Sequence, residues 1–533
     1  MLWVAVHLPL LSLESFAATL AASGSDEAEA ERPIALLEAH RIVSANAAAQ
    51  ALGVKAGLKR ATALALAPQI VLGQADAERD AQALLPVAHA ALAFTPAVSL
   101  QPPLQPGAAT DTVLLEVQAS LRYFGGLERL LDAIHGALRP LGHLVHVACA
   151  TTAQGAAILA RVESPPCCTD LAATRAALAA APVWLLGPGR EHWEALQGMG
   201  LQRLDDLLGL PRAGLARRFG EGLLVELDRA FGRRPDPREP IAVPPSFESR
   251  LELFARADTT EQVLHGAAVL LERLIAWLAA QHAFVRRFRL LMHHEARWQS
   301  ERTPQATALE IALAEPSRDS AHLLLLLREQ LARARLPAPT LELRLQAEDI
   351  TRRAPPNAEL FATTQSEHEG LTRLIERLQA RLGPGRVQRL VALEDHRPER
   401  ASALCEARAA GAGPEGRAGK KRRRNGATGV AANPSPPAGA AMPARPVWLQ
   451  AAEPLPERAA RPLLDGRPLQ LLSGPERIEA GWWDSGLAGR DYFIAATPEG
   501  ALVWIYRERL PLSRDANEEE AGASGWFLHG RFG

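Results

Sequence analysis

The stretch that decides the fold is Val113-Leu-Leu-Glu-Val-Gln-Ala-Ser-Leu-Arg-Tyr-Phe-Gly-Gly126. Its apolar start predicts a buried strand, and the Gly-Gly pair predicts a turn after it. Asp111 and Thr112 stand just ahead of this strand. A second apolar stretch, Trp3-Val-Ala-Val-His-Leu-Pro9, predicts another strand, which carries His7. These polar residues beside two buried strands form the candidate site.

This pattern resembles the catalytic centre of Y-family translesion DNA polymerases, in which Ser-x-Asp-Glu precedes a similar strand. In that family the two carboxylates and an Asp on the first strand hold two Mg²⁺ about 4 Å apart for phosphoryl transfer. Here Asp111 is kept, but Thr112 stands at the Glu position and His7 at the first-strand Asp position. Asp111 alone cannot bridge two hard cations. The resemblance therefore implies the family fold, no metal, no cofactor and no catalysis.

A second segment, Ile42 to Leu58, resembles the fingers of the same family. It keeps the family's packing residues Asn46, Gly53, Val54 and Gly57. The Tyr and Arg that grip the incoming triphosphate in the family are replaced by Ala47 and Gln50, and a nearby family lysine is absent where this chain has Arg161. Removing one such contact costs ~10²–10³ in rate, so several losses together predict no practical turnover.

Two other function classes remain open from the residues. One is an active translesion polymerase with substitute ligands such as His7, Asp111 and Glu116. The other is a nucleic-acid-binding module without a role in replication. A misalignment by one residue does not restore the site, because Leu8, Pro9 and Leu10 carry no carboxylate and Glu14 lies too far along.

Composition limits the remaining possibilities. A chain of 533 residues with 47% apolar content supports several cores. The net charge of −1 predicts modest DNA affinity, because nonspecific DNA binding draws on a basic surface. The four cysteines include no C-x-x-C pair, which favours reduced thiols in the cytoplasm. We expect neither a signal peptide nor a membrane span.

The predicted architecture is α+β and multidomain, with a Y-family-like palm, fingers, thumb and little finger followed by a linker and a small β-rich module. The expected parts are 1–170 palm and fingers (fingers about 30–75), 175–240 thumb, 245–350 little finger, 354–362 clamp-binding peptide, 365–401 helical segment, 402–446 disordered linker and 447–533 C-terminal module. From Ser246 to Ala347 the patterns predict a β-α-β-β-α-β order, as in the family's little finger.

The thumb-like part contains Leu186-Gly-Pro-Gly-Arg-Glu-His-Trp-Glu-Ala-Leu-Gln-Gly-Met-Gly-Leu201, which resembles a helix-hairpin-helix. In such a motif glycines let backbone N–H groups approach a DNA phosphate. The candidate DNA-binding residues are Gly187, Gly189, Arg217 and Arg218. A plain αα-hairpin with glycine caps fits the same pattern.

Between the little finger and the linker, two segments suggest interactions or packing. Asn357-Ala-Glu-Leu-Phe361 is similar to the peptide by which bacterial polymerases dock on the β sliding clamp, with Asn357, Leu360 and Phe361 as contacts. Gln365 to Leu382 then predicts an amphipathic helix whose leucines lie on one face. The linker run Lys420-Lys-Arg-Arg-Arg424 either solubilises the chain or touches nucleic acid.

The C-terminal part alternates aromatic and polar residues, as strands do. A module of this size cannot bury every aromatic side chain, so a partner surface is expected at Trp482, Trp483, Arg490, Tyr492 and Trp526. The alternative is that all of them are core residues. The whole pattern is identified as that of a catalytically silent branch of the family, which implies a role in SOS mutagenesis. The implied partners are damaged primer-template DNA, the sliding clamp, an error-prone DnaE-type polymerase and a RecA-like accessory protein.

Overall fold

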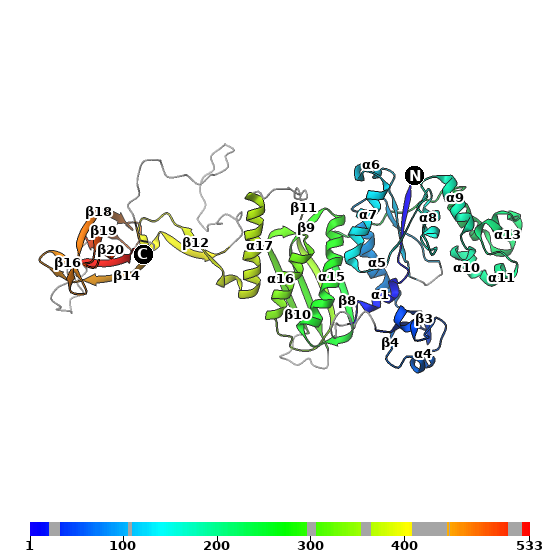
Figure 1. Ribbon diagram of the computed structural model, residues 1–533, viewed down its shortest axis with the longest axis horizontal. Coiled ribbons are helices and arrows are strands. Elements are labelled where there is room, and N and C mark those ends of the chain that lie inside the picture. The colour runs from blue at the N-terminus through cyan, green and yellow to red at the C-terminus, as the bar shows by residue number, and fades with distance from the viewer. Residues whose placement is uncertain are drawn as a thin grey trace. The chain divides into compact units, whose positions relative to one another are not determined.

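The structure is a computed structural model. It describes residues 1–20, 32–104, 109–295, 305–352, 364–407, 445–446, 448–484, 486–509 and 525–532. The chain divides into two compact units, Met1–Leu382 and Gly383–Gly533 (Figure 1). Both contain helical or 3₁₀ segments and β-sheets, which confirms the predicted α+β, multidomain class.

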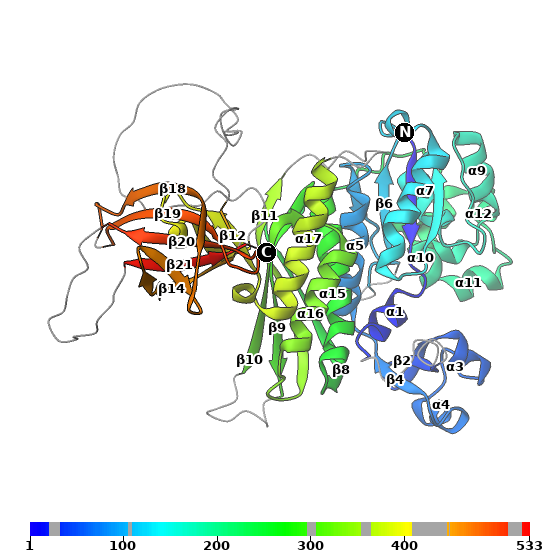
Figure 2. The same ribbon diagram turned by 60° about the vertical axis from the view of Figure 1, so that its left-hand side comes forward.

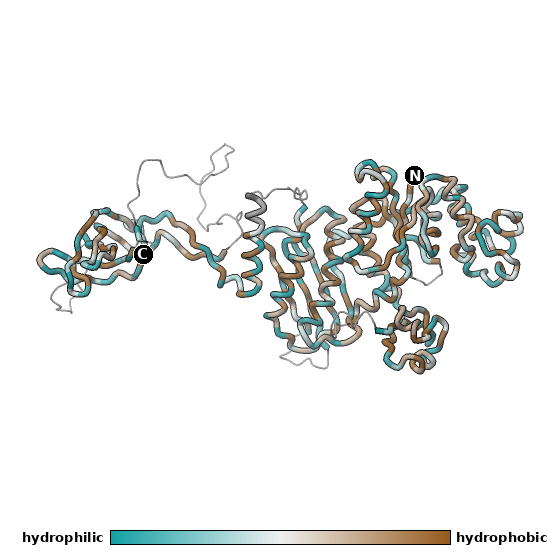
Figure 3. The backbone as a smooth tube through the Cα atoms, in the orientation of Figure 1, coloured by the Kyte–Doolittle hydropathy of each residue, from teal (hydrophilic) through white to brown (hydrophobic). Residues whose placement is uncertain are grey.

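The N-terminal sheet has four antiparallel strands in the order β5-β6-β1-β7. Its strands are β1 (Trp3–His7), β5 (Val98–Leu100), β6 (Thr112–Glu116) and β7 (His146–Ala150). The helices packed on its two faces are α5 (Ala77–Ala91), α7 (Leu127–Leu138) and α8 (Ala153–Leu159). Side chains alternate between faces, so Val4 and Val6 join the core with α5 and α7 while Ala5 joins the core with α8. Coverage on both faces explains the continuous apolar sequence of β1 (Figure 3).

A small sheet in the order β3-β2-β4 lies in the stretch expected to form the fingers. Its elements are β2 (Ile34–Glu38), β3 (Arg41–Ala45), β4 (Val71–Gln74), α3 (Ala47–Ala51) and α4 (Arg60–Leu66), and α1 (Leu11–Ala17) precedes them. Gly53 and Gly57 have φ angles of +88° and +89°, in the left-handed region that side chains disfavour. Gly53 and Gly57 therefore allow the backbone to turn at these two positions between α3 and α4.

A helical region follows the N-terminal sheet. It consists of α9 (Leu171–Ala180), α10 (Gly187–Glu191), α11 (Trp193–Gly198), α12 (Leu204–Leu208), α13 (Arg212–Phe219) and α14 (Glu221–Ala230). Its leucines share one core with α8, and α11 and α12 flank the predicted Gly-Met-Gly turn. Packing against α8 is what orients these short helices, since helices of five to ten residues are marginal alone.

The second sheet has the order β10-β9-β11-β8. Its elements are β8 (Phe247–Ala257), α15 (Thr260–Ala280), β9 (Ala283–His294), β10 (Ala306–Ser317), α16 (Ser320–Arg333) and β11 (Thr340–Arg352). This is the predicted β-α-β-β-α-β order, although β8 and β11 are longer than expected. Helices α15 and α16 pack on one face of the sheet (Figures 1 and 2). Helix α15 is long and apolar enough to cross a membrane, but 56% of its apolar window is buried in this core.

Helix α17 (Thr364–Leu382) packs against α16 and β10, but not through the face that carries most of its leucines. Thr372, Glu376 and Ala380 are buried, whereas Leu374 and Leu378 are 51% and 37% exposed. The buried carboxylate of Glu376 accepts hydrogen bonds from the backbone N–H of Ala314 and Glu315 and contacts the ring of His322. Specific hydrogen bonds, rather than leucine burial, therefore dock this helix.

The second unit combines a two-stranded ribbon with a C-terminal sheet in the order β14-β21-β20-β19-β18 and a smaller β15-β16-β17 sheet. Its strands are β12 (Gln388–Ala392), β13 (Ser402–Glu406), β14 (Trp448–Leu455), β15 (Glu457–Arg458), β16 (Arg461–Leu464), β17 (Arg467–Pro468), β18 (Gln470–Ala480), β19 (Ala488–Ala496), β20 (Leu502–Glu508) and β21 (Trp526–Arg531).

Two expected boundaries are wrong here. The helical segment predicted for 365–401 is helical only to Leu382, because Gly383 and Pro384 end α17 and β12 follows. The linker predicted for 402–446 begins later, because Ser402–Glu406 pairs with β12 as β13. Residues 408–444, including the Lys420 to Arg424 run, lie outside the described part of the chain.

Candidate functional site: a polymerase-like centre closed by an ion pair

The candidate site lies where β1 and β6 meet at one end of the N-terminal sheet. His7 stands opposite Thr112 in the antiparallel register, and Asp111 directly precedes β6. The Nδ1 atom of His7 lies 3.1 Å from Oγ1 of Thr112, which donates a hydrogen bond to Oδ1 of Asp111 at 2.8 Å. The three residues singled out from the sequence are therefore brought together.

A fourth residue, Arg161, completes the site. Its side chain is 5% exposed, and its Nη2 donates to Oδ1 of Asp111 at 2.6 Å. From the sequence, Arg161 is recognised only as standing where the family has a lysine. No local pattern predicts its contact with Asp111, which lies 50 residues away in the chain. The guanidinium supplies positive charge directly beside the Asp111 carboxylate.

The electrostatics of Asp111 follow from these neighbours. Burial opposes ionisation, but the hydrogen bond with His7 and the charge of Arg161 outweigh it and hold the pKa of Asp111 well below its usual range. Asp111 is thus a carboxylate at neutral pH, and its Oδ1 atom is shared among Arg161, Thr112 and His7. The arrangement is an ion pair in which three side chains of the chain itself surround one carboxylate oxygen.

These residues do not fit the two-metal centre of the family. Such a centre needs carboxylates on both strands, and β1 and β6 supply His7 and Thr112 at those positions. Glu116, the other ligand considered, is paired with Trp3, four residues along β6 from Thr112. At a rise of about 3.3 Å per residue this places it roughly 13 Å away. Within the described residues, no group of three or more His, Cys, Asp or Glu side chains could hold a metal ion.

Ala47 and Gln50, the positions predicted to have lost contacts to a nucleotide, lie on the short helix α3. Ala47 is exposed and offers no polar side chain. Gln50 is also exposed, but its Nε2 donates to the carbonyl of Ala45 at 2.6 Å. Asn46 caps α3 by accepting from the N–H of Ala49, and it also binds the backbone of Ile34. Asn46 thus has a structural task, because it holds the start of α3 and the start of β2 through backbone hydrogen bonds.

The candidate DNA-binding glycines are packing residues. Gly187 and Gly189 are buried, and a Cβ on Gly189 would stand 2.2 Å from the carbonyl oxygen of Val183. The N–H of Gly187 donates to Glu226, whose pKa burial raises. The prediction that Gly187 and Gly189 lie on a DNA-facing surface is therefore wrong, because both are buried. Arg217 and Arg218 do lie exposed on α13.

The open face of the second sheet, opposite α15 and α16, carries arginines paired with acids. Arg287 lies 3.4 Å from Glu310, Arg289 lies 2.9 Å from Glu348, and Arg344 lies 2.8 Å from Glu342. Charges that are paired within the protein have less attraction for phosphate. On this face, Arg287, Arg289 and Arg344 are therefore neutralised within the sheet.

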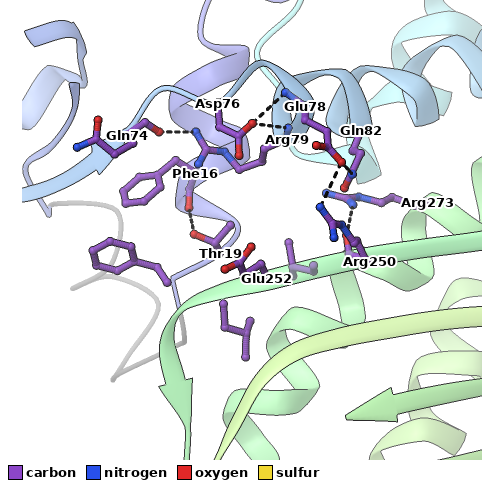
Figure 4. Close-up of a pocket in the computed structure, with 13 residues that line it drawn as sticks. Phe16, Thr19, Gln74, Asp76, Glu78, Arg79, Gln82, Arg250, Glu252 and Arg273 are labelled. Atoms are coloured by element: carbon purple, nitrogen blue, oxygen red, sulfur yellow. Dashed lines mark hydrogen bonds and ion pairs between the residues drawn. The ribbon is translucent and has the colours of Figure 1, made fainter. Parts of the chain in front are cut away.

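A charged pocket of about 320 Å³ lies where α1 and α5 approach β8 (Figure 4). Glu78 accepts a hydrogen bond from Arg250 at 3.2 Å, and the Arg79 guanidinium donates to the carbonyl of Gln74. Asp76 caps α5 by accepting from the N–H groups of Glu78 and Arg79. The charged groups of this pocket therefore join the helix to the second sheet and the small sheet.

In the second unit, the segment Asp395 to Arg400 is tied to the loop between β18 and β19. The buried guanidinium of Arg397 binds both oxygens of Asp484 at 2.9 and 2.8 Å and the carbonyl of Gly486 at 2.7 Å. It also donates to Asp395, and these bonds lower the pKa of Asp395 to about 2. The sequence did not predict this cluster, because Asp484 lies 87 residues from Arg397 along the chain.

Two of the five residues predicted to form a partner surface are buried. Trp482 and Trp483 are 80% and 52% exposed, beside the Arg397 cluster. Tyr492 is fully buried, Trp526 is 5% exposed, and the Arg490 side chain is 18% exposed and lies over the Tyr506 ring. Tyr492 and Trp526 are thus core residues: the Tyr492 ring stacks on Trp504, and the Trp526 ring packs at a tilt against Phe493. The predicted clamp-binding residues Asn357, Leu360 and Phe361 lie outside the described residues.

The chain is similar in sequence to two curated bacterial proteins. No family model matches the chain. Protein ImuB of Caulobacter vibrioides strain NA1000 / CB15N is 29% identical over 498 residues, covering 90% of this chain and 100% of that protein. The chain is similar to Protein ImuB. Protein ImuB of strain ATCC 19089 / CIP 103742 / CB 15 gives the same values.

Solved structures give weaker likenesses. The insertion ternary complex of Dbh DNA polymerase is 16% identical, covering 66% of this chain and 100% of that chain, with a TM-score of 0.37. DinB from Sulfolobus solfataricus is 15% identical, covering 65% and 98%, with a TM-score of 0.35. The similarity to Protein ImuB, by contrast, extends over nearly the whole chain and includes the second unit.

Proposed function

We propose that this chain is a non-catalytic, Y-family polymerase-like scaffold in error-prone translesion DNA synthesis. The observation that carries the proposal is the Asp111–Arg161 ion pair, with Nη2 and Oδ1 2.6 Å apart. If a metal ion displaced Arg161 from Asp111, the guanidinium would lose its carboxylate partner. The Arg161 side chain is only 5% exposed, so leaving its charge unpaired there is costly. Metal binding at Asp111 is therefore opposed by the protein itself, in addition to the ligands already missing.

The alternative of an active polymerase needs substitute ligands. His7 offers a nitrogen that contacts Thr112, and Glu116 is roughly 13 Å along β6 from Thr112 at about 3.3 Å per residue. Neither supplies the oxygen that would bridge two Mg²⁺ with Asp111. Ala47 and Gln50 add no grip on a triphosphate. Primer extension by the purified chain separates this alternative from the scaffold.

The proposed scaffold binds damaged primer-template DNA with modest affinity. Arg217 and Arg218 on α13 are exposed cations for phosphate, while the arginines of the second sheet are paired with acids. We expect the double change Arg217→Ala and Arg218→Ala to weaken DNA binding uniformly across sequences and to flatten its salt dependence. A matched control is Arg344→Ala, which removes an arginine already bound to Glu342. Equal losses in both variants would contradict the assignment.

The proposed partners follow from the resemblance. The 354–362 peptide would dock on the β sliding clamp, and the C-terminal module would recruit an error-prone DnaE-type polymerase with a RecA-like accessory protein. Such a scaffold acts by raising the effective concentration of the catalytic polymerase at the lesion. It would work in the cytoplasm during the SOS response to DNA damage.

Affinity purification of the full chain after DNA damage, with partners identified by mass, tests this assembly. Recovery of the clamp and a DnaE-type polymerase supports the scaffold. A nucleic-acid-binding module without a replication role would recover DNA but neither protein. A clamp pull-down with purified components distinguishes these two outcomes directly.

A further inference from the structure

Two cysteines that lie apart in sequence meet at the edge of the N-terminal sheet. The Sγ atoms of Cys149 and Cys167 are 3.2 Å apart. Cys149 is on β7 and is fully buried, whereas Cys167 is exposed. Their closeness follows from the backbone, because Cys149 and Cys167 form a parallel β-bridge.

The backbone around this pair is fixed by hydrogen bonds on both sides. The N–H of Cys149 donates to the carbonyl of Pro166 at 3.2 Å, and the N–H of Cys168 donates to the carbonyl of Cys149 at 2.9 Å. Neighbouring strands lie about 4.7–4.9 Å apart, and disulfides span Cα separations of roughly 4.4–6.8 Å. The bridge geometry therefore accommodates a disulfide without a large backbone movement.

The two thiols differ in chemistry. The hydrogen bond with Cys149 lowers the pKa of Cys167 to about 7, against the opposing effect of burial. The same hydrogen bond, together with burial, raises the pKa of Cys149. Cys167 thus carries more thiolate at neutral pH than an ordinary cysteine, and it is the one that solvent reaches.

We propose that Cys167 is a peroxide-reactive modification site whose resolving partner is Cys149. The Cys167 thiolate attacks one peroxide oxygen, the O–O bond breaks, and water leaves after protonation of the other oxygen. The resulting Cys167 sulfenic acid is attacked by the Cys149 sulfur; an S–S bond forms, and the departing hydroxide takes the Cys149 proton as water. One hydrogen peroxide is reduced to two waters while two thiols are oxidised to one disulfide.

The other cysteines lack this arrangement. Successive side chains of an extended segment point to opposite faces, and Cys168 is buried in the core shared by α8 and the helical region. Cys405 is exposed on β13, where its strand partner is Arg389. Cys405 therefore provides an exposed thiol without a cysteine opposite, which is a matched control. No three-ligand metal cluster occurs among the described residues, so the pair is not part of such a site.

The disulfide would join β7 to the segment just before α9 and enclose α8 in a loop with a sequence separation of 18. Oxidation would thereby fix covalently the connection between the N-terminal sheet and the helical region. This modification is independent of whether the chain catalyses synthesis, because neither cysteine contacts Asp111 or its partners in the described hydrogen bonds.

The test is treatment of the reduced full chain with a small excess of hydrogen peroxide, followed by blocking of thiols, proteolysis and mass spectrometry without reductant. The expected product is a linked peptide pair containing Cys149 and Cys167, which dithiothreitol reverses, together with a higher melting temperature. Cys405→Ser should behave as the parent. Cys167→Ser should abolish the link and leave Cys149 reduced, and Cys149→Ala should accumulate a Cys167 sulfenic acid that dimedone traps.

The rate gives a second readout. At neutral pH, a thiol with a pKa near 7 has a thiolate fraction roughly 15-fold higher than a thiol with a pKa of about 8.5. The less basic thiolate is also less nucleophilic, which lowers its intrinsic rate constant about fivefold. The net expectation is about threefold faster peroxide reaction at Cys167 than at an ordinary exposed thiol. Equal reaction at Cys167 and Cys405 without the Cys149 link, or a Cys167–Cys168 link instead, would overturn the proposal.

Discussion

The Arg161 guanidinium binds the Asp111 carboxylate, with Nη2 2.6 Å from Oδ1. Arg161 follows α8 and Asp111 precedes β6, so the pair also ties the helix to the strand that it covers. His7 and Thr112 complete the hydrogen bonding around the same oxygen. A positive charge supplied by the chain itself thus lies beside the carboxylate that the sequence resemblance predicts at a metal-binding position.

This ion pair predicts a specific dependence of stability on pH. The pKa of Asp111 is held below its usual range, so its contribution is present above the unfolded value near 3.9 and is lost as pH falls through the folded pKa. Asp111→Asn should therefore melt below the parent at pH 7, and the difference should shrink below about pH 4. Asp132→Asn, an exposed change on α7, is the control. A difference in melting temperature that stays constant from pH 7 to pH 3 would contradict this assignment.

Helix α17 buries Glu376 and exposes Leu374. Replacing the polar Glu376 should therefore destabilise the fold more than replacing the apolar Leu374. Glu376→Ala removes the acceptor of the Ala314 and Glu315 N–H groups and the partner of His322, at a cost of ~1–3 kcal/mol of unfolding free energy. Leu374→Ser alters an exposed side chain and should change stability by less than about 0.5 kcal/mol. Denaturant unfolding of both variants measures the contrast. The opposite ranking would mean that the leucines are buried in solution.

The α17 result shows where sequence patterns reach their limit. Periodicity correctly predicts the order of elements from β8 to β11, because alternating and helical spacing are local properties. The face that α17 buries depends on His322 and the backbone of β10, and the local pattern contains neither. Local patterns also cannot predict the pairing of Arg161 with Asp111 or of Arg397 with Asp484, because these partners lie 50 and 87 residues away.

The candidate site shows the same division. The family resemblance predicts that His7, Asp111 and Thr112 share one site, and the register of β1 against β6 does bring them together. The buried places of Gly187, Tyr492 and Trp526 were missed, since glycines and aromatic residues serve cores and surfaces with the same local signal. Only the packing of neighbouring elements separates the two uses.

The clamp peptide leads to a prediction outside the described residues. Replacing Leu360 and Phe361 with Ala removes two apolar anchors, each worth a few kcal/mol when buried, so clamp binding should weaken at least roughly tenfold. Fluorescence anisotropy or surface binding with purified clamp measures the change. Ala358→Gly, within the same peptide, is a control that keeps both anchors. Unchanged affinity in the double variant would place the docking peptide elsewhere.

The exposed tryptophan pair predicts a separable recruitment defect. Trp482→Ala with Trp483→Ala should reduce capture of the DnaE-type polymerase or its accessory protein by at least about tenfold while leaving clamp and DNA binding unchanged, because exposed tryptophans anchor interfaces. The melting temperature should stay near that of the parent. Trp526→Ala, a core change, should instead lower the melting temperature. Parental capture by the double variant would remove these residues from the partner surface.

Primer extension by the purified chain, on damaged and undamaged templates with Mg²⁺ or Mn²⁺, tests the non-catalytic proposal most directly. We predict no nucleotide incorporation by the parent. We also predict none after His7→Asp and Thr112→Glu together, because Arg161 still occupies Asp111 and the triphosphate still lacks its Tyr and Arg contacts at Ala47 and Gln50. Metal-dependent incorporation by the parent that Asp111→Ala abolishes would contradict it.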